Sequence, residues 1–345
     1  MKIAVDAMGG DYAPREIVKG IELARDRYSD VNFQLYGKID QLKPLIKNPA
    51  RLKLIQADQV IKMGDVPVRS VLTKRHSSLD LAARAVKQHR ADAFLSAGNS
   101  GAILAAGLFI VGRIKGIDRP GFATTLPVIH GHHDRFLMLD VGANAESKPL
   151  NLYQYAFLGK YYAQKVLKIN NPRVGLMNNG TEADKGDRLH QTDHRLLSKR
   201  DDLNFVGNVE SRELLNGVAD VVVCDGFSGN AVLKSMEGTA LSMLKLIKHR
   251  ILNDGVKAKL GALLLKSTFK RIGQKLDYSK YGGAVLMGVK APFVKMHGNS
   301  KAMTVRNTVG QIRTMVKSKT IDNVVNYFDS HATEMTAIKR QAQKN

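Results

Sequence analysis

Short apolar runs alternate with helical patterns along most of these 345 residues, and this alternation constrains the fold more than any other feature. The runs predict strands at 2–6, 31–36, 52–56, 92–96, 121–128, 135–140, 173–177, 203–207, 219–223, 284–287 and 291–296. Apolar residues three and four apart predict helices at 14–28, 78–89, 101–112, 150–168, 190–199, 211–216, 229–250 and 300–317. We therefore predict an α/β fold with helices on both faces of a parallel or mixed sheet. No low-complexity linker divides the chain, so 1–345 is a single α/β domain or two interwoven lobes.

Polar loops that contain glycine follow five of the predicted strands. They are Gly9–Asp11, Ser96–Ala102, Asp140–Glu146, Asn178–Glu182 and Cys224–Asn230. In an open α/β sheet, the loops at the carboxyl ends of the strands face one crevice, where ligands bind. We therefore expect all five loops to line a single polar cleft that accepts an anion.

The opening segment indicates how such a cleft would hold an anion. An apolar run ends at Asp6, passes through Gly9 and Gly10, and reaches Pro14, which opens a helical pattern. This arrangement brings backbone N–H groups and a helix N-terminus toward a negative charge. The alternative is a tight turn that binds nothing. Neither the Gly-x-Gly-x-x-Gly spacing of dinucleotide-binding loops nor a Walker A sequence occurs, which argues against dinucleotides and P-loop nucleotides.

The loops supply the candidate functional residues. Glycines permit close backbone approach, Asn and Ser offer neutral hydrogen bonds, and Lys and His offer charge or protons. Candidates for phosphate or substrate binding are Asp6, Gly9, Gly10, Asp11, Gly98, Asn99, Ser100, Gly101, Asn144, Glu146 and Asp225. Candidate catalytic residues are Lys185, Asn230, Lys234 and His297. For Asp11, a turn-holding role is favoured over catalysis.

Two further features have a functional and a structural interpretation. Cys224 ends an apolar strand and could accept an acyl group, but no nucleophile elbow surrounds it, so a buried small residue is favoured. Residues 130–134 read His-Gly-His-His-Asp, but no second group of ligands accompanies them. We expect a solvated turn there, and no metal or other cofactor.

The amino-acid composition restricts the classes of partner that this protein can be expected to bind. Lys and Arg number 53 against 31 Asp and Glu, a net charge of +22, which favours an acidic protein, an anionic substrate or an anionic membrane surface. The chain has no Trp and no basic stripe interleaved with aromatics, so a nucleic acid is not expected. A single cysteine, the lack of a signal peptide pattern and the lack of a long apolar run favour the cytoplasm.

Residues 250–276 form a basic, leucine-rich segment that predicts an amphipathic helical hairpin. Leucines lie between lysines in this segment. A hairpin of this kind suits the surface of an anionic bilayer, although burial in the core or at a subunit contact is the alternative. The candidate membrane contacts are Leu260, Leu263, Leu264, Lys266 and Lys270.

Several of these motifs together resemble those of the phosphate acyltransferase family, the acyl-ACP:phosphate transacylases of bacterial phospholipid synthesis. The motifs are Asp6–Asp11, Ser96–Ala102, Gly142–Glu146, Cys224–Asn230 and Tyr281–Ala284. The resemblance covers nearly the whole chain, from residue 4 to about residue 300.

The resemblance implies an activity, a fold and partners. The activity is transfer of a long-chain fatty acyl group from the thioester of acyl carrier protein to inorganic phosphate. The acyl phosphate would feed a membrane-bound glycerol-3-phosphate acyltransferase. The fold would be a Rossmann-like α/β/α sandwich, like those of isocitrate dehydrogenases and phosphotransacetylases. A homodimer, associated peripherally with the inner face of the cell membrane through the hairpin, is also implied.

The mechanism that follows is direct attack of phosphate on the thioester carbonyl. The loops around Gly9 and Gly98, with Lys185, would hold phosphate, and Asn230, Asn144 or backbone N–H groups would stabilise the oxyanion. His297 or Lys234 would balance charge or protonate the leaving thiolate. Two alternatives stay open: a phosphotransacetylase-like enzyme that uses acyl-CoA, and a non-enzymatic protein that binds membranes or nucleic acid.

Overall fold

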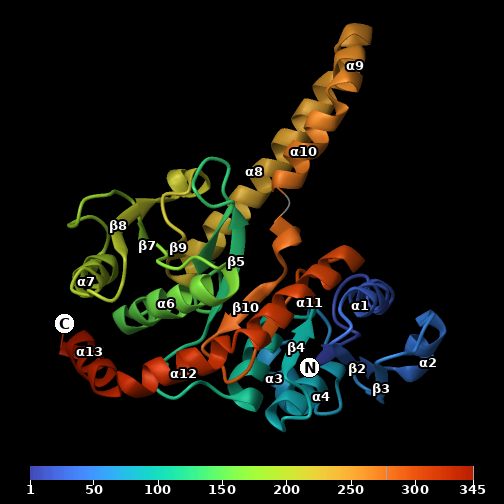
Figure 1. Ribbon diagram of the computed structural model, residues 1–345, viewed down its shortest axis with the longest axis horizontal. Helices are drawn as coiled ribbons and strands as arrows, with labels where there is room; N and C mark the ends of the chain where they lie inside the picture. Colours follow the sequence, from blue (N-terminus) through green and yellow to red (C-terminus); the bar gives the residue numbers. More distant parts are fainter. Residues whose placement is uncertain (277, 345) are drawn as a thin grey trace.

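The computed structural model describes residues 1–276 and 278–344, and within them each predicted strand forms (Figure 1). The strands are β1 (Lys2–Asp6), β2 (Asn32–Gly37), β3 (Leu52–Gln56), β4 (Ala93–Ser96), β5 (Gly121–Pro127), β6 (Arg135–Leu139), β7 (Val174–Asn178), β8 (Phe205–Glu210), β9 (Val221–Val223), β10 (Ala284–Met287) and β11 (Phe293–Lys295). They make one eleven-stranded sheet in the order β3-β2-β1-β4-β11-β10-β5-β6-β9-β7-β8. The predicted α/β class is therefore confirmed.

The helices cover both faces of this sheet. The α-helices are α1 (Arg15–Arg27), α2 (Ile39–Leu42), α3 (Pro67–Thr73), α4 (Ser78–Lys87), α5 (Ser100–Ala106), α6 (Pro149–Tyr162), α7 (Arg188–Leu197), α8 (Gly226–Asn253), α9 (Gly255–Leu264), α10 (Lys266–Leu276), α11 (Ala302–Lys317), α12 (Thr320–Ser330) and α13 (Ala332–Lys344). Short 3₁₀ or π segments are η1 (Lys43–Leu45), η2 (Gly107–Val111), η3 (Ala163–Leu167), η4 (Ser211–Asn216) and η5 (Tyr278–Tyr281). The helices α2, α3, α12 and α13 lie outside the predicted elements.

The strand directions divide the sheet into two halves. β1, β2, β3, β4 and β11 run parallel to one another. β10 is antiparallel to both β11 and β5, and β6 is antiparallel to β5. β6, β7, β8 and β9 are parallel among themselves and so run opposite to β1. The carboxyl ends of the two halves therefore lie at opposite edges of the sheet, which we call the first edge (β1, β4, β11) and the second edge (β6, β7, β9).

Alternating side chains of the strands build the core on the two faces. Ile3 and Val5 pack on the face that carries α1, α6 and α11, whereas Ala4 packs on the face that carries α4 and α5. On that second face, the Phe94 and Phe293 rings stack with their centroids 3.8 Å apart, which joins β4 to β11. Val232 and Leu233 of α8 pack against the same cluster.

The helical hairpin projects from the body of the molecule (Figure 1). α8 forms its outgoing arm, and α9 and α10 lead back. The hairpin predicted at 250–276 therefore includes the tip and the returning arm. The outgoing arm lies mostly before residue 250, in the helix predicted at 229–250. The body and the hairpin are joined through α8 and η5.

Candidate active site

The loops after β1 and β4 interlock at the first edge. The Ser96 hydroxyl donates to Asp6 Oδ2 at 2.7 Å, and the Gly98 amide donates to Ser96 Oγ at 2.9 Å. A Cβ on Gly9 would lie 2.5 Å from Asp6 Oδ2 and 2.8 Å from the Gly98 nitrogen, so only glycine fits. Burial raises the pKa of the Asp6 carboxyl, against the hydrogen bonds it accepts from Ser78 and Ser96. Asp6 therefore stabilises the loop through hydrogen bonds, and the backbone of the glycines is the part of the loop that a ligand can contact.

The loop after β11 joins the same edge. The Asp11 amide donates to the Gly298 carbonyl at 2.8 Å, so this loop lies against the first one. The exposed His297 comes directly before Gly298, and Ser100 is exposed at the start of α5. Asn99 caps that helix, where its Oδ1 accepts from the Ala102 amide at 3.1 Å.

The side-chain amide of Asn99 is occupied. Its Nδ2 donates to the carbonyls of Met63 and Asp65 at 2.9 and 3.0 Å, which ties the segment before α3 to the loop after β4. Gly101 permits this approach, since a Cβ there would lie 2.5 Å from Pro67 Cγ. Asn99 and Gly101 therefore shape the first edge through packing.

At the second edge, Asp140 organises the loop after β6. Its Oδ1 accepts from the amides of Phe122, Gly142 and Ala143, and its Oδ2 accepts from the Asn144 amide at 2.9 Å. Burial raises the pKa of this carboxyl, although these donors oppose the shift.

The side-chain amide of Asn144 is also occupied. Its Nδ2 donates to the Pro120 carbonyl at 2.8 Å and to the Tyr155 hydroxyl at 2.9 Å. Glu146, in the same loop, is exposed, and its carbonyl accepts from Arg119. The loop therefore presents Asn144 as a structural residue and Glu146 at the surface.

The side chain of Asn230 lies beside this loop. Gly142 has φ +118°, and a Cβ on it would lie 3.1 Å from Asn230 Cγ, so glycine makes room for the asparagine. In the described part of the chain, the Asn230 side chain has no hydrogen-bond partner. Its half-buried amide is therefore available to a ligand.

Asp225 and His190 form a second group at this edge. Asp225 caps α8 by accepting from the Phe227 and Ser228 amides at 3.0 and 2.9 Å. His190 Nε2 lies 3.9 Å from Asp225 Oδ2, and its Nδ1 lies 2.7 Å from Asp187 Oδ1. His190 was not among the residues predicted from the sequence, although it follows the helix-capping Asp187 by three residues.

Lys185 lies in the loop after β7, also at the second edge. Its side chain is exposed, and a Cβ on Gly180 would lie 2.8 Å from Lys185 Cγ. The Asn178 side chain donates to the Lys185 carbonyl at 3.1 Å, which folds this loop over the end of β7.

The expectation that all five loops line one edge is wrong. The loops around Gly9 and Gly98 lie at the first edge, whereas those around Asn144, Lys185 and Asp225 lie at the second. The physical reason is the antiparallel insertion of β10, β5 and β6, which reverses the direction of the second half of the sheet.

Helix α8 connects the two edges. It begins beside the second edge, and Lys234 follows Asn230 by one turn. Farther along, Glu237 and Lys234 act electrostatically on Lys295, the last residue of β11. Burial lowers the pKa of Lys295, with Glu237 opposing the shift. Lys295, which was not among the residues predicted from the sequence, precedes His297 by two residues.

Cys224 is fully buried and donates to the Asp140 carbonyl at 3.1 Å. Burial, with Asp140 and Asp225 nearby, raises the pKa of its thiol well above the usual value. The favoured structural interpretation of Cys224 is confirmed. Residues 130–134 form an exposed turn between β5 and β6, and no group of three or more His, Cys, Asp or Glu suited to a metal occurs in the described residues.

The predicted membrane contacts lie on the hairpin. Leu264 is 84% exposed, and Leu260 and Leu263 are also exposed. Lys266 and Lys270 follow on α10 and are exposed as well. No helix in the described ranges has the length and apolar character to cross a membrane.

Comparison with known proteins decides the family. The model of the fatty acid synthesis protein family matches residues 1–323. A protein of Levilactobacillus brevis named phosphate acyltransferase is 60% identical over 340 residues, which cover 98% of this chain and 99% of that protein. One of Enterococcus faecalis with the same name is 54% identical over 332 residues, or 96% of this chain and 100% of that protein. The chain belongs to the phosphate acyltransferase family.

Solved structures agree on the fold of this family member. A branched-chain phosphotransacylase from Enterococcus faecalis superposes with a TM-score of 0.59 at 13% identity, covering 92% of this chain and 99% of that one. A phosphotransacetylase from Streptococcus pyogenes gives 0.58 at 15% identity, covering 93% and 94%. These likenesses confirm the phosphotransacetylase-like sandwich.

Proposed function

We propose that this protein transfers a long-chain fatty acyl group from the thioester of acyl carrier protein to inorganic phosphate. The family match over nearly the whole chain is the observation that carries this proposal. The acyl phosphate would serve phospholipid synthesis, where a membrane-bound glycerol-3-phosphate acyltransferase would consume it. The net charge of +22 suits encounter with an acidic carrier protein.

The reaction requires no acyl-enzyme. A phosphate oxygen attacks the thioester carbonyl, a tetrahedral oxyanion forms, and the carbon–sulfur bond breaks as the thiolate takes a proton. The buried Cys224 thiol, whose pKa is raised, supports this direct route over a covalent one. Positioning and charge stabilisation are then the main tasks of the protein.

We assign the reaction centre to the path along α8 between the two edges. Phosphate would lie by the glycine loops of the first edge, near Lys234 and Lys295, and Asn230 would donate to the oxyanion. Asn230 and Lys234, four residues apart on one helix, have Cβ atoms about 5–6 Å apart. His297 would protonate the thiolate. Lys185, at the second edge, would stabilise the oxyanion in place of the phosphate role proposed from sequence.

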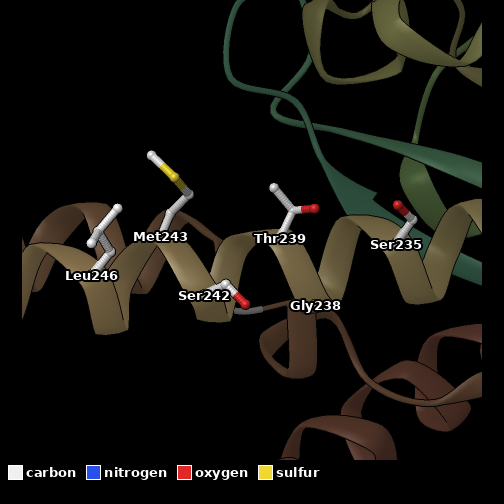
Figure 2. A pocket seen from close by; sticks show the side chains of 6 residues that line it. All are labelled: Ser235, Gly238, Thr239, Ser242, Met243 and Leu246. Atoms are coloured by element: carbon white, nitrogen blue, oxygen red, sulfur yellow. The ribbon is translucent and has the colours of Figure 1, made fainter.

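Peripheral membrane association through the hairpin and a cytoplasmic location are part of the proposal. The exposed leucines between lysines on α9 and α10 support it. A homodimer is proposed as well. A surface pocket of about 420 Å³ on α8 is lined by Ser235, Gly238, Thr239, Ser242, Met243 and Leu246 (Figure 2). With the exposed Phe227 and Leu241 on the same helix, this surface would be covered by a second copy.

The deciding experiment supplies purified protein with acyl carrier protein thioester and phosphate. We expect acyl phosphate, trapped with hydroxylamine, together with free carrier thiol. No phosphate-dependent product would overturn the proposal. Acyl-CoA as a parallel donor tests the phosphotransacetylase-like alternative, which the fold likeness favours. Cys224→Ser is expected to keep most of the activity, and complete loss in a folded variant would restore the covalent route.

A further inference from the structure

A basic pocket of about 350 Å³ lies on the face of the sheet that carries α1 and α11. Six segments far apart in sequence converge on it: the end of α1, the middle of α11, β5, the start of β6, the α6–η3 region and η5. None of the loops assigned above to the reaction contributes a lining residue. We call this cavity the basic pocket.

The lining of the basic pocket has one sign of charge. Its cationic residues are Arg27, Arg135, Lys280, Arg306 and Arg313. No Asp or Glu is among its lining residues. Cations that converge in a concave site repel one another and focus a positive potential, so an anion in the pocket lowers the electrostatic energy.

Two of these arginines are held in place by neighbouring side chains. Arg313 Nε donates to Asp30 Oδ1 at 2.8 Å, and its guanidinium lies 5.3 Å from the centre of the Tyr28 ring. Arg135 Nε donates to Asp134 Oδ1 at 2.9 Å, and its guanidinium lies 5.4 Å from the centre of the Tyr281 ring. Side chains fixed in this way lose little conformational freedom when a ligand binds.

Two other arginines of the pocket, Arg27 and Arg306, have no acidic partner among the described residues. Within the described residues, neither Arg27 nor Arg306 forms an ion pair, and Arg306 donates only to Asn307 Oδ1 at 3.1 Å. Their planar forks match the oxygens of a phosphate group.

A neutral donor lies deeper in the pocket. The fully buried Tyr162 hydroxyl accepts from Gln311 Nε2 at 2.8 Å. Burial raises the pKa of Tyr162 to about 12, so the phenol keeps its proton at neutral pH.

We propose that the basic pocket binds a small molecule that carries a phosphate group, at a site separate from the reaction centre. The volume suits a phosphorylated headgroup or metabolite, because small-molecule sites begin at roughly 300 Å³. Such a ligand would bridge the two halves of the sheet. It would also contact η5, the segment through which the hairpin rejoins the body.

Calorimetric titration at low salt tests this proposal with two probes that share a phosphomonoester. Phenyl phosphate represents a soluble ligand, and dihexanoyl phosphatidic acid below its micelle concentration represents a lipid headgroup. We compare Arg27→Gln/Arg306→Gln with Arg75→Gln/Arg195→Gln, a control that removes two arginines elsewhere on the surface. Arg27→Gln alone, at an exposed position, covers the case in which the double variant misfolds.

The double variant is expected to bind both probes at least about tenfold more weakly, with a smaller loss for Arg27→Gln and none for the control. Its phosphate KM in acyl transfer is expected to stay unchanged, which separates the two sites. Tighter binding of the phosphatidic acid assigns a lipid headgroup, and equal binding assigns a soluble phosphate compound. Binding by folded Arg27 variants that equals the wild type, or a loss of the same size in the control, overturns the proposal.

Discussion

The strand-end loops and the helical hairpin use glycine in opposite ways. In the loops, a Cβ on Gly9 would lie 2.5 Å from a carboxylate oxygen, and one on Gly229 would overlap the Asp140 carbonyl oxygen. In the hairpin, Gly238, Gly261 and Gly273 have no neighbouring atom within 4 Å of the Cβ position. In the loops, packing therefore determines which amino acid each position can hold. In the hairpin, the overall balance of apolar and basic residues on the surface matters more than the residue at any one position.

The largest expected effect of this contrast is on catalysis. Asn230→Ala removes the free amide beside Gly142, and we expect kcat to fall roughly 100-fold because an oxyanion donor is lost. Asn253→Ala makes the same chemical change at the other end of α8 and is expected to leave kcat unchanged. Steady-state kinetics with acyl carrier protein thioester measures both. Equal rates for the two variants would remove Asn230 from the reaction centre.

Stability gives the next effect. Gly229→Ala places a methyl group against the Asp140 carbonyl and the Cys224 sulfur, and we expect it to cost about 2–3 kcal/mol through overpacking. Gly261→Ala, in α9 of the hairpin with open space around it, is expected to stabilise by about 0.5–1 kcal/mol through helix propensity. Urea unfolding compares the pair. Similar losses in both would show that the loops are not more closely packed than the hairpin.

The difference between the two regions also explains what the sequence could predict. Period-two and period-3.6 patterns are local, so strands such as 2–6 and 284–287 and helices such as 229–250 were identified from them. Which strands pair, and in which direction, depends on contacts between distant segments. For that reason the reversal at β10, β5 and β6, and with it the second edge, was not predicted.

The site residues follow the same rule. Residue type marked Asn99, Asn144 and Asn230 equally as polar loop residues. Only the three-dimensional contacts distinguish the occupied amides of Asn99 and Asn144 from the free amide of Asn230. Lys295 was missed because the charges that act on it, those of Glu237 and Lys234, belong to a helix that begins about 70 residues earlier in the chain.

A smaller effect is expected at Asp193, in α7 over the second half of the sheet. Its carboxylate is buried, and neither oxygen has a hydrogen-bond partner among the described residues. Burial raises its pKa well above the usual value, so the folded state holds a proton that the unfolded state releases above about pH 4. The free energy of unfolding therefore falls as pH rises from about 4 toward the folded-state pKa.

Asp193→Asn removes this proton linkage. We expect the difference in free energy of unfolding, Asp193→Asn minus wild type, to be about 1 kcal/mol larger at pH 8 than at pH 5. Urea unfolding at both pH values measures the difference, and the exposed Asp201→Asn serves as the control. A wild-type pH dependence in Asp193→Asn would mean that this carboxyl is ionised in the folded protein.

The smallest effect on stability is expected for a substitution in the hairpin, and the same substitution is expected to have a large effect on membrane binding. Leu264→Glu changes a side chain that is 84% exposed, so the free energy of unfolding should move by no more than about 0.5 kcal/mol. Soluble turnover should also stay unchanged. Binding to vesicles that contain anionic lipid should fall, because the variant loses apolar area and gains a negative charge.

Leu264→Met, which keeps the apolar character, is the matched control, and vesicle sedimentation at low and high salt separates the apolar contribution from the basic one. If Leu264→Glu binds vesicles as well as the control does but destabilises the protein, the exposed leucines belong to a subunit contact. The hairpin would then resemble the strand-end loops in needing particular residues at particular positions.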